Sequence, residues 1–231
     1  MMDHVALDRG LLRVEVPSRP LLRARDSAAP RWAAALAAAL TATRRASPRR
    51  ARHDALGTPM HRPLTRCTLR SWRPSDAERL AAIADDRDVW RMLRDRFPSP
   101  YSLAHAEAFI ARVTAEQPVR NVAISVDDVA MGAVGVTPGE DINRISGEVG
   151  YWLAAEARGK GLATEALRGF VDWLWETTEL HHLFASVFTN NRESARVLEK
   201  CGFTLSCVAQ KSAIKDGQIM DEWRYHLVRP E

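Results

Sequence analysis

A glycine-rich turn joins a predicted strand to a predicted helix in the second half of the chain. The strand covers residues 146–153 and the turn covers residues 158–161, which read Arg-Gly-Lys-Gly. The helix that follows carries apolar residues on one face, at Leu162, Ala166, Phe170 and Leu174. A turn at a helix start leaves several backbone N–H groups free, with the positive end of the helix dipole behind them. The arrangement is therefore that of a binding site for a phosphate or pyrophosphate group, and the alternative for the turn taken alone is an ordinary glycine-containing helix start.

Two common phosphate-binding motifs do not fit this turn. A Walker A loop has Ser or Thr directly after its lysine, whereas Gly161 follows Lys160 here. A dinucleotide-binding fingerprint would require glycine in place of Thr164, within a parallel strand–helix–strand unit. The turn is thus predicted to bind its anion in a different fold from either of these classes.

The rest of the pattern predicts one α+β domain with a mostly antiparallel sheet. Strands are expected at residues 64–72, 119–126, 129–136, 146–153, 183–188, 203–213 and 219–228. Helices are expected after a capping box from Ser75 to Glu78, after Pro100, from Leu162, and from Asn191 to Cys201, where Gly202 ends the helix. Tight hairpin turns are expected at Asp127-Asp128 and at Asp216-Gly217.

The positive charge of the chain is confined to its first quarter. Residues 1–59 are rich in Ala and Arg and have a net charge of +6, so the remainder of the +4 chain carries −2. This distribution excludes a nucleic-acid-binding role for the body of the protein. For residues 1–59 three interpretations stay open: a disordered extension, a start codon assigned too early with Met60 as the true beginning, or a basic arm for a ribosome, nucleic acid or anionic lipid.

Cysteine usage and hydropathy point to a soluble, cytoplasmic protein. The three cysteines, Cys67, Cys201 and Cys207, are odd in number and lack Cys-x-x-Cys spacing. This argues against a disulfide framework and against a cysteine-based zinc site, and fits a reducing compartment. The longest apolar run, residues 32–40, is much shorter than the approximately 20 residues of a membrane span. No membrane partner is expected.

Four motifs follow one another in the second half of the chain. Arg158-x-x-Gly161-x-Ala163 is the first, and residues 191–203, which read Asn-x-x-Ser-x-x-x-x-Glu-Lys-x-Gly-Phe, are the second. They resemble the acetyl-CoA signature and the second motif of the GNAT N-acetyltransferase superfamily. The run Gly150-Tyr151-Trp152-Leu153, and Asp216-Gly217 with Asp221 and Tyr225, are similar to the RimJ/RimL branch, which includes ribosomal-protein-alanine acetyltransferases. The resemblance covers residues 64–229, so residues 60–231 are expected to form the GNAT domain.

The resemblance implies a fold and a reaction. The sheet of a GNAT fold is mixed and mostly antiparallel, is flanked by helices, and splays between its fourth and fifth strands, here residues 146–153 and 183–188. The reaction is transfer of an acetyl group from acetyl-CoA to a primary amine by direct attack, without a metal. The acceptor would be a protein N-terminal α-amine or a small-molecule amine. The alternative is a non-catalytic acyl-CoA-binding or interaction module on the same fold, and either form would be a monomer or a homodimer.

The resemblance also implies where acetyl-CoA binds. The pantetheine arm would lie in the gap between the splayed strands, beside backbone groups of Trp152 and Leu153. The pyrophosphate would lie on the turn, and the next helix would face the arm and the sulfur. The expected cofactor-binding residues are Trp152, Leu153, Arg158, Gly159, Lys160, Gly161, Leu162, Ala163, Asn191 and Ser194.

Two residues are expected to carry the chemistry. Glu148, on the strand beside the gap, is the candidate base that takes a proton from the amine through water; the alternative is a strand-edge carboxylate that only orders a loop. Ser194 is the candidate that donates a hydrogen bond or proton to the departing thiolate, because the family's usual tyrosine position holds Leu198; the alternative is a hydroxyl in the first helical turn that only supports this turn. Ribosomal L7/L12-type enzymes also carry a glutamate where this chain has Ala213, which puts that substrate in doubt.

Two further groups of residues have less specific interpretations. Trp90 and residues 91–97 would border the acceptor pocket in this fold, and Arg91, Arg94 and Arg96 are interpreted as a solvated face in preference to a basic lid. His181 and His182 are adjacent, so on a strand they would point to opposite faces, and no metal site is predicted from them.

Overall fold

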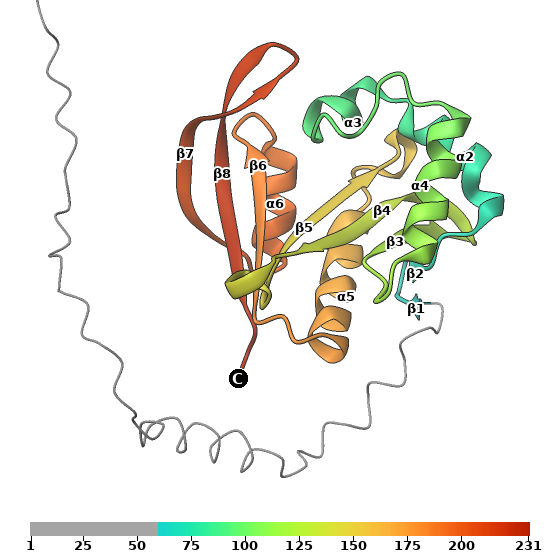
Figure 1. Cartoon of the computed structure of the whole chain (residues 1–231). Coiled ribbons are helices and arrows are strands. Elements are labelled where there is room, and N and C mark those ends of the chain that lie inside the picture. The colour runs from blue at the N-terminus through green and yellow to red at the C-terminus, as the bar shows by residue number, and fades with distance from the viewer. Residues whose placement is uncertain (1–59) are drawn as a thin grey trace, which may run out of the picture. The chain divides into compact units, whose positions relative to one another are not determined.

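The computed structural model describes residues 60–231, and the predictions for residues 1–59 lie outside this part. Eight strands form one sheet in the order β1-β2-β3-β4-β5-β6-β8-β7 (Figure 1). Their bounds are β1 His61–Pro63, β2 Thr68–Arg70, β3 Asn121–Val126, β4 Val129–Pro138, β5 Ser146–Leu153, β6 His182–Phe188, β7 Thr204–Lys215 and β8 Gln218–Val228. The predicted α+β architecture is confirmed. All neighbouring strands are antiparallel except β5 and β6, which are parallel.

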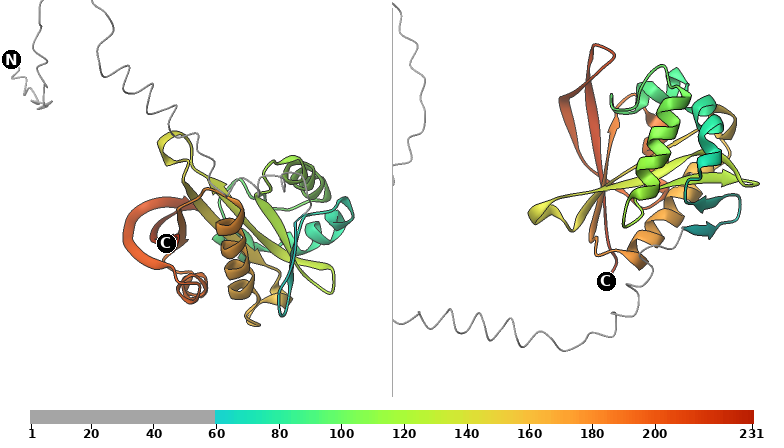
Figure 2. Two further views of the ribbon diagram at one scale, coloured as in Figure 1. Left: turned by 90° about the horizontal axis from the view of Figure 1, so that it is seen from below. Right: turned by 45° about the vertical axis from the view of Figure 1, so that its right-hand side comes forward.

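Helices cover both faces of the sheet, and each face has its own apolar core (Figure 2). The helices are α2 Ala77–Ala84, α3 Arg87–Met92, α4 Leu103–Ala115, α5 Leu162–Thr177 and α6 Arg192–Lys200. The larger core joins one face of the sheet to α5 and α6, and the smaller core joins the other face to α2 and α4. The predicted face of α5, at Leu162, Ala166, Phe170 and Leu174, is buried throughout.

The strands β5 and β6 separate after a short stretch of pairing, as Figure 1 shows. Only three residue pairs join them, and the last is Glu148 with Phe184. Beyond this point β5 continues to pair with β4, and β6 continues to pair with β8. The predicted splay between residues 146–153 and 183–188 is therefore confirmed, and it leaves the adjoining backbone edges of the two strands without a strand partner.

The start of the domain differs from the prediction. In place of one strand at residues 64–72, the short strands β1 and β2 form a hairpin around a turn at residues 64–67. The turn brings the backbone N–H of Arg66 to the Glu165 carboxylate on α5, at 2.7 Å. It also packs Leu64 against Gly169, where an added Cβ would lie 2.8 Å from the leucine side chain. Contacts with α5 thus override the strand pattern.

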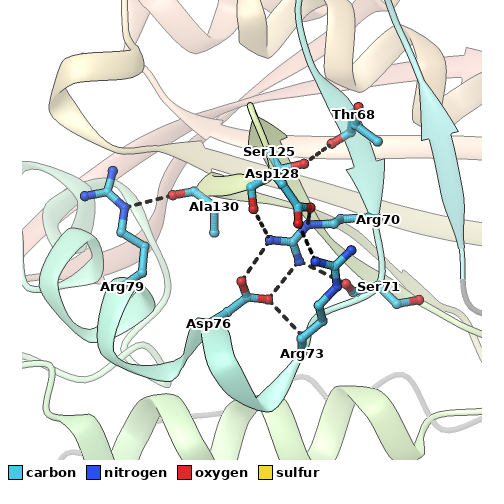
Figure 3. A network of polar contacts seen from close by, with 9 residues as sticks. All are labelled: Thr68, Arg70, Ser71, Arg73, Asp76, Arg79, Ser125, Asp128 and Ala130. Carbon is cyan, nitrogen blue, oxygen red and sulfur yellow. Dashed lines mark hydrogen bonds and ion pairs between the residues drawn. The ribbon is translucent and has the colours of Figure 1, made fainter.

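The capping box predicted from Ser75 to Glu78 is also wrong, because Asp76 has a different role. Helix α2 begins at Ala77, and the Asp76 carboxylate accepts hydrogen bonds from the Arg73 backbone and from Arg70. The Arg70 side chain is 2% exposed and contacts both carboxylate oxygens at 2.8 Å (Figure 3). It also contacts the Asp128 carbonyl, so it joins the first turn of α2 to the β3–β4 hairpin.

The hairpin turns follow the prediction. Asp127, Asp128, Asp216 and Gly217 all have positive φ angles, which two-residue hairpin turns require. The first turn joins β3 to β4, and the second joins β7 to β8 at Lys215 and Gln218. Within residues 60–231, no helix is long and apolar enough to cross a membrane.

Candidate active site

The glycine turn forms an open cradle of backbone N–H groups. Gly159 and Gly161 have φ angles of +72° and +77°, and Gly161 directly precedes α5. A Cβ added at Gly159 would meet no heavy atom within 4 Å, whereas one added at Gly161 would lie 2.9 Å from the Arg66 guanidinium, so the open space adjoins Gly159. Within residues 60–231, the N–H groups of residues 159–161 donate no hydrogen bond. The turn can therefore accept an anion, as its sequence predicts.

Two arginines fix the position of this turn. The Arg158 side chain donates to the Leu153 carbonyl at 3.2 Å and to the Asp86 carboxylate at 2.5 Å. From the other side, Arg66 donates to the Lys160 carbonyl at 2.9 Å and forms an ion pair with Glu165 at 2.8 Å. Neither Asp86 nor Arg66 was expected from the sequence, because their partners lie 72 and 94 residues away along the chain.

The turn is continuous with the unpaired edge of β5. Trp152 and Leu153 end the strand, Arg158 follows one short helical turn at Ala155–Ala157, and Leu162 and Ala163 begin α5. These predicted cofactor-binding residues therefore lie along one path from the gap between β5 and β6 to the start of α5. A chain-like ligand with an anionic end fits such a path.

Helix α6 presents Ser194 to β5. Asn191 caps this helix and accepts a hydrogen bond from the Ser194 N–H at 3.1 Å. The Tyr151 hydroxyl lies 2.9 Å from the Ser194 hydroxyl and 3.0 Å from its carbonyl. Burial raises the pKa of Tyr151, while its hydrogen bond with Ser194 works in the opposite direction. Tyr151 is therefore a neutral hydroxyl, fixed against the serine.

Tyr151 is a site residue that the sequence interpretation used only as part of a family motif. The signal for it was available, because successive residues of a strand point to opposite faces. Val149 and Leu153 belong to the larger core, so Tyr151 points toward α5 and α6 as they do. Leu198, in the usual tyrosine position, is fully buried in that core.

Glu148 points to the opposite face of β5, toward α3 and α4. Its side chain is 19% exposed and forms an ion pair with Arg94, which follows α3 in the chain. Arg94 is 58% exposed, as expected for a solvated face, and its ion pair with Glu148 is a contact that the sequence did not predict. The two residues are 54 positions apart, so no local pattern reveals the contact. Glu148 and Ser194 do not contact each other.

The segment around α3 also contacts the tip of the β7–β8 hairpin, which lies beside it in Figure 1. Lys215 is 5% exposed, contacts the Asp95 carboxylate at 2.7 Å, and lies 3.9 Å above the Trp90 ring. Arg87 forms a further ion pair with Asp216 at 2.9 Å. These contacts hold the α3 segment across the open end of the gap between β5 and β6.

The histidines on β6 and β8 pack against other rings. The His182 ring stacks on Phe184 and on His226, with ring centroids 6.0 Å apart in both pairs. Among the residues that the structure describes, no group of three or more His, Cys, Asp and Glu side chains could hold a metal ion.

Comparison with known protein families identifies this arrangement. The family described as "Acetyltransferase (GNAT) domain" matches residues 66–204, which is more than half of the chain. The chain belongs to this GNAT acetyltransferase family. The match includes the glycine turn, Glu148, Tyr151 and Ser194.

Similar proteins agree with this assignment. YjcK of Bacillus subtilis (strain 168), which carries the name of an N-acetyltransferase, is 36% identical over 83 residues, or 36% of this chain and 46% of YjcK. The chain thus spans about half the length of this GNAT relative. YdaF of the same organism, which carries the name of a ribosomal N-acetyltransferase, is 28% identical over 171 residues, or 71% of this chain and 92% of YdaF.

A solved structure shares the GNAT fold. It is RimL, a ribosomal L7/L12 alpha-N-protein acetyltransferase, in complex with coenzyme A. It superposes with a TM-score of 0.65 at 17% identity, over 73% of this chain and 98% of that chain. The identity is low, so this likeness concerns the fold.

Proposed function

We propose that this GNAT acetyltransferase transfers the acetyl group of acetyl-CoA to a primary amine, with residues 60–231 as the transferase domain. One observation carries the proposal. The free N–H groups of the glycine turn, the unpaired edge of β5 and the Glu148 carboxylate adjoin one gap in the sheet. This combination supplies an anion site, a groove for an extended chain, and a proton acceptor at the point where the groove begins.

The residues present fit acetyl-CoA. N–H groups of residues 159–163 would hold its pyrophosphate, because they lie at a helix start and those of residues 159–161 donate no hydrogen bond within residues 60–231. The backbone of Trp152 and Leu153, on the unpaired edge of β5, would pair with its pantetheine arm. When bound, acetyl-CoA supplies a reactive thioester carbonyl and a thiolate leaving group. Asn191 would adjoin the arm while its side-chain oxygen caps α6.

Glu148 is proposed to take a proton from the acceptor. An alkylammonium has a pKa of about 10, so it must lose a proton before its nitrogen can attack. A carboxylate that is largely shielded from water, as Glu148 is, holds the ammonium and accepts that proton directly or through water. Glu148 takes this role because it is the last β5 residue paired with β6.

Ser194 and Tyr151 are proposed to act at the leaving sulfur, on the other face of β5. The amine nitrogen forms a bond to the carbonyl carbon, the carbon–sulfur bond breaks, and the sulfur leaves with the electron pair. The Ser194 hydroxyl donates a hydrogen bond or a proton to that sulfur. The neutral Tyr151 hydroxyl, 2.9 Å from the Ser194 hydroxyl, holds the serine in position or donates a proton to it in turn. The products are an N-acetyl amide and free coenzyme A.

The acceptor is proposed to be a protein N-terminal α-amine or a small-molecule amine. The name of YdaF and the description of RimL both refer to ribosomal acceptors, which favours the first class. The absence of a glutamate at Ala213 argues against the L7/L12 protein itself. The three free cysteines fit a cytoplasmic location, where thiols stay reduced.

Coenzyme A release over a panel of amines tests this proposal. The panel contains peptides with different first residues and small primary amines. We expect turnover of at least one acceptor, a large loss in Glu148→Gln, and unchanged acetyl-CoA binding by calorimetry in that variant. Glu140→Gln, the same change at an exposed carboxylate in the preceding loop, is the matched control and should keep full activity.

The opposite result would favour a different function. If acetyl-CoA binds, no amine in the panel is acetylated, and Glu148→Gln changes nothing, the protein is a non-catalytic acyl-CoA-binding module.

A further inference from the structure

An open position lies between two side-chain contacts on the α3-facing side of β5. Glu148, Gly150 and Trp152 alternate along this side, because every second residue of a strand shares a face. Glu148 is paired with Arg94, and Trp152 contacts Phe97 with ring centroids 5.8 Å apart. Between them Gly150 is exposed, and a Cβ added there would meet no heavy atom within 4 Å.

This position has the dimensions of a small acceptor. Residues 148 and 152 are four strand steps apart, which corresponds to about 13 Å. The floor is the backbone of Gly150, one end is the charged pair, and the other end is the aromatic pair. Arg94 and Phe97 both come from the segment after α3, so this segment runs along the open position and forms its wall.

At the charged end, an acceptor ammonium can replace Arg94 as the partner of Glu148. An acceptor ammonium that reaches Glu148 must take the place of the Arg94 guanidinium, because both cations bind the same carboxylate. Arg94 then needs another anion, and the neighbouring acidic residues are already paired. Asp86 binds Arg158, Asp88 lies 4.0 Å from Arg91, Asp95 binds Lys215, and Asp216 binds Arg87.

We propose that the acceptor is a primary amine with a carboxylate close to it, bound over Gly150 with its amine at Glu148 and its carboxylate at Arg94. This inference rests on the proposed function and names its substrate class. A guanidinium is suited to the task, because it binds a carboxylate through two parallel hydrogen bonds. Arg94 would thereby act as a specificity-determining residue, releasing Glu148 only for an acceptor that supplies a new anion.

Matched acceptor pairs test the proposal. Each pair has the same amine with and without the charge: an amino acid and its amide, or a peptide beginning with Asp and the same peptide beginning with Asn. We expect the wild type to prefer the carboxylate member by at least about tenfold in kcat/KM, the usual size of a charged hydrogen bond. The pair that shows the preference distinguishes a free α-carboxylate from an acidic side chain.

Variants of Arg94 locate the preference. Arg94→Ala should remove it, mainly by raising KM for the carboxylate member, and Arg94→Lys should retain part of it. Arg91→Ala, at a neighbouring exposed arginine 4.0 Å from Asp88, is the control and should leave the preference intact. A wild type without preference, or an Arg94→Ala variant that keeps it, would overturn the proposal.

Filling the open position gives a second, independent test. Gly150→Val should raise the acceptor KM at least about tenfold, while Tm and acetyl-CoA binding stay unchanged, because no protein atom occupies the space. Unchanged acceptor KM would show that the acceptor binds elsewhere. If the wild type releases no coenzyme A with any amine, the proposed function itself fails, which is distinct from turnover without a carboxylate preference.

Discussion

The two faces of β5 carry different kinds of chemistry, at residues that are three positions apart along the strand. On the α3 face, Glu148 holds an exposed arginine from a loop, and an open position adjoins it at Gly150. On the α6 face, Tyr151 is half-buried against the larger core and hydrogen-bonded to Ser194 on a capped helix. A cation in a loop can be exchanged for a substrate cation, whereas a neutral hydroxyl pair that packs against a core is held in one geometry. The strand thus separates the end that binds the amine from the end that serves the sulfur.

The largest expected effect concerns the base. Glu148→Gln preserves the shape of the side chain and removes the proton acceptor, so kcat/KM should fall by roughly 10²–10⁴-fold. Acetyl-CoA affinity should be unchanged, because the glycine turn that binds the pyrophosphate is remote from this face. Steady-state kinetics and calorimetry measure both quantities. A Glu148→Gln variant with full activity would remove the chemical distinction between the two faces.

A smaller effect is expected on the α6 face. Tyr151→Phe and Ser194→Ala should each lower kcat by roughly 10- to 100-fold without raising KM for the amine. The kcat of the double variant should be close to that of the less active single variant, since the two hydroxyls act through one hydrogen bond. Independent, multiplicative losses in the double variant would contradict this coupling.

The smallest effect is one on stability and concerns Asp86, which joins the start of α3 to Arg158. The Asp86 carboxylate accepts the Asp88 N–H at the start of α3 and contacts Arg158 at 2.5 Å. Its partial burial alone would raise its pKa, but the Asp88 N–H and the Arg158 guanidinium outweigh this and hold the pKa below the usual range. Asp86→Asn keeps a capping residue and removes the charge, and should cost about 1 kcal/mol of unfolding free energy at pH 7.

The pH dependence of that cost follows from the direction of the shift. A depressed carboxylate pKa stabilises the fold above the unfolded value of about 3.9, and the stabilisation is lost as the pH falls through the folded value. Chemical denaturation of both proteins should therefore give a difference at pH 7 that shrinks below about pH 4. A difference that grows in acid would contradict the ion pair with Arg158.

Local sequence signals predicted the elements that build the site, but not the contacts between them. The α5 face, the end of α6 before Gly202 and the turn at Asp216-Gly217 were predictable because their determinants lie within a few residues. The residues of the Arg94–Glu148 pair are 54 positions apart and those of the Tyr151–Ser194 pair are 43 apart, so neither contact produces a periodic pattern in the sequence.

The errors at the start of the domain have the same cause. The predicted strand at residues 64–72 is interrupted because the Arg66 backbone binds Glu165, which lies 99 residues away. The predicted cap at Ser75 fails because Asp76 binds the buried Arg70 instead. In both places a charged side chain from another element, Glu165 or Arg70, binds a group for which the local pattern had predicted no partner.

A series of acceptors that differ in amine basicity tests the separation of the two faces most directly. In this series kcat/KM is measured at one pH for the wild type, Glu148→Gln and Tyr151→Phe, from aliphatic aminocarboxylates whose amine has a pKa of about 10 to weakly basic aminobenzoates, so that every acceptor carries a carboxylate for Arg94. Weakly basic amines bind in the neutral form and have no ammonium proton to lose. The loss of kcat/KM in Glu148→Gln relative to the wild type should therefore shrink at least tenfold along the series, while the loss in Tyr151→Phe stays constant. Equal deficits of Glu148→Gln for every amine, or a Tyr151→Phe deficit that follows amine basicity, would contradict the account.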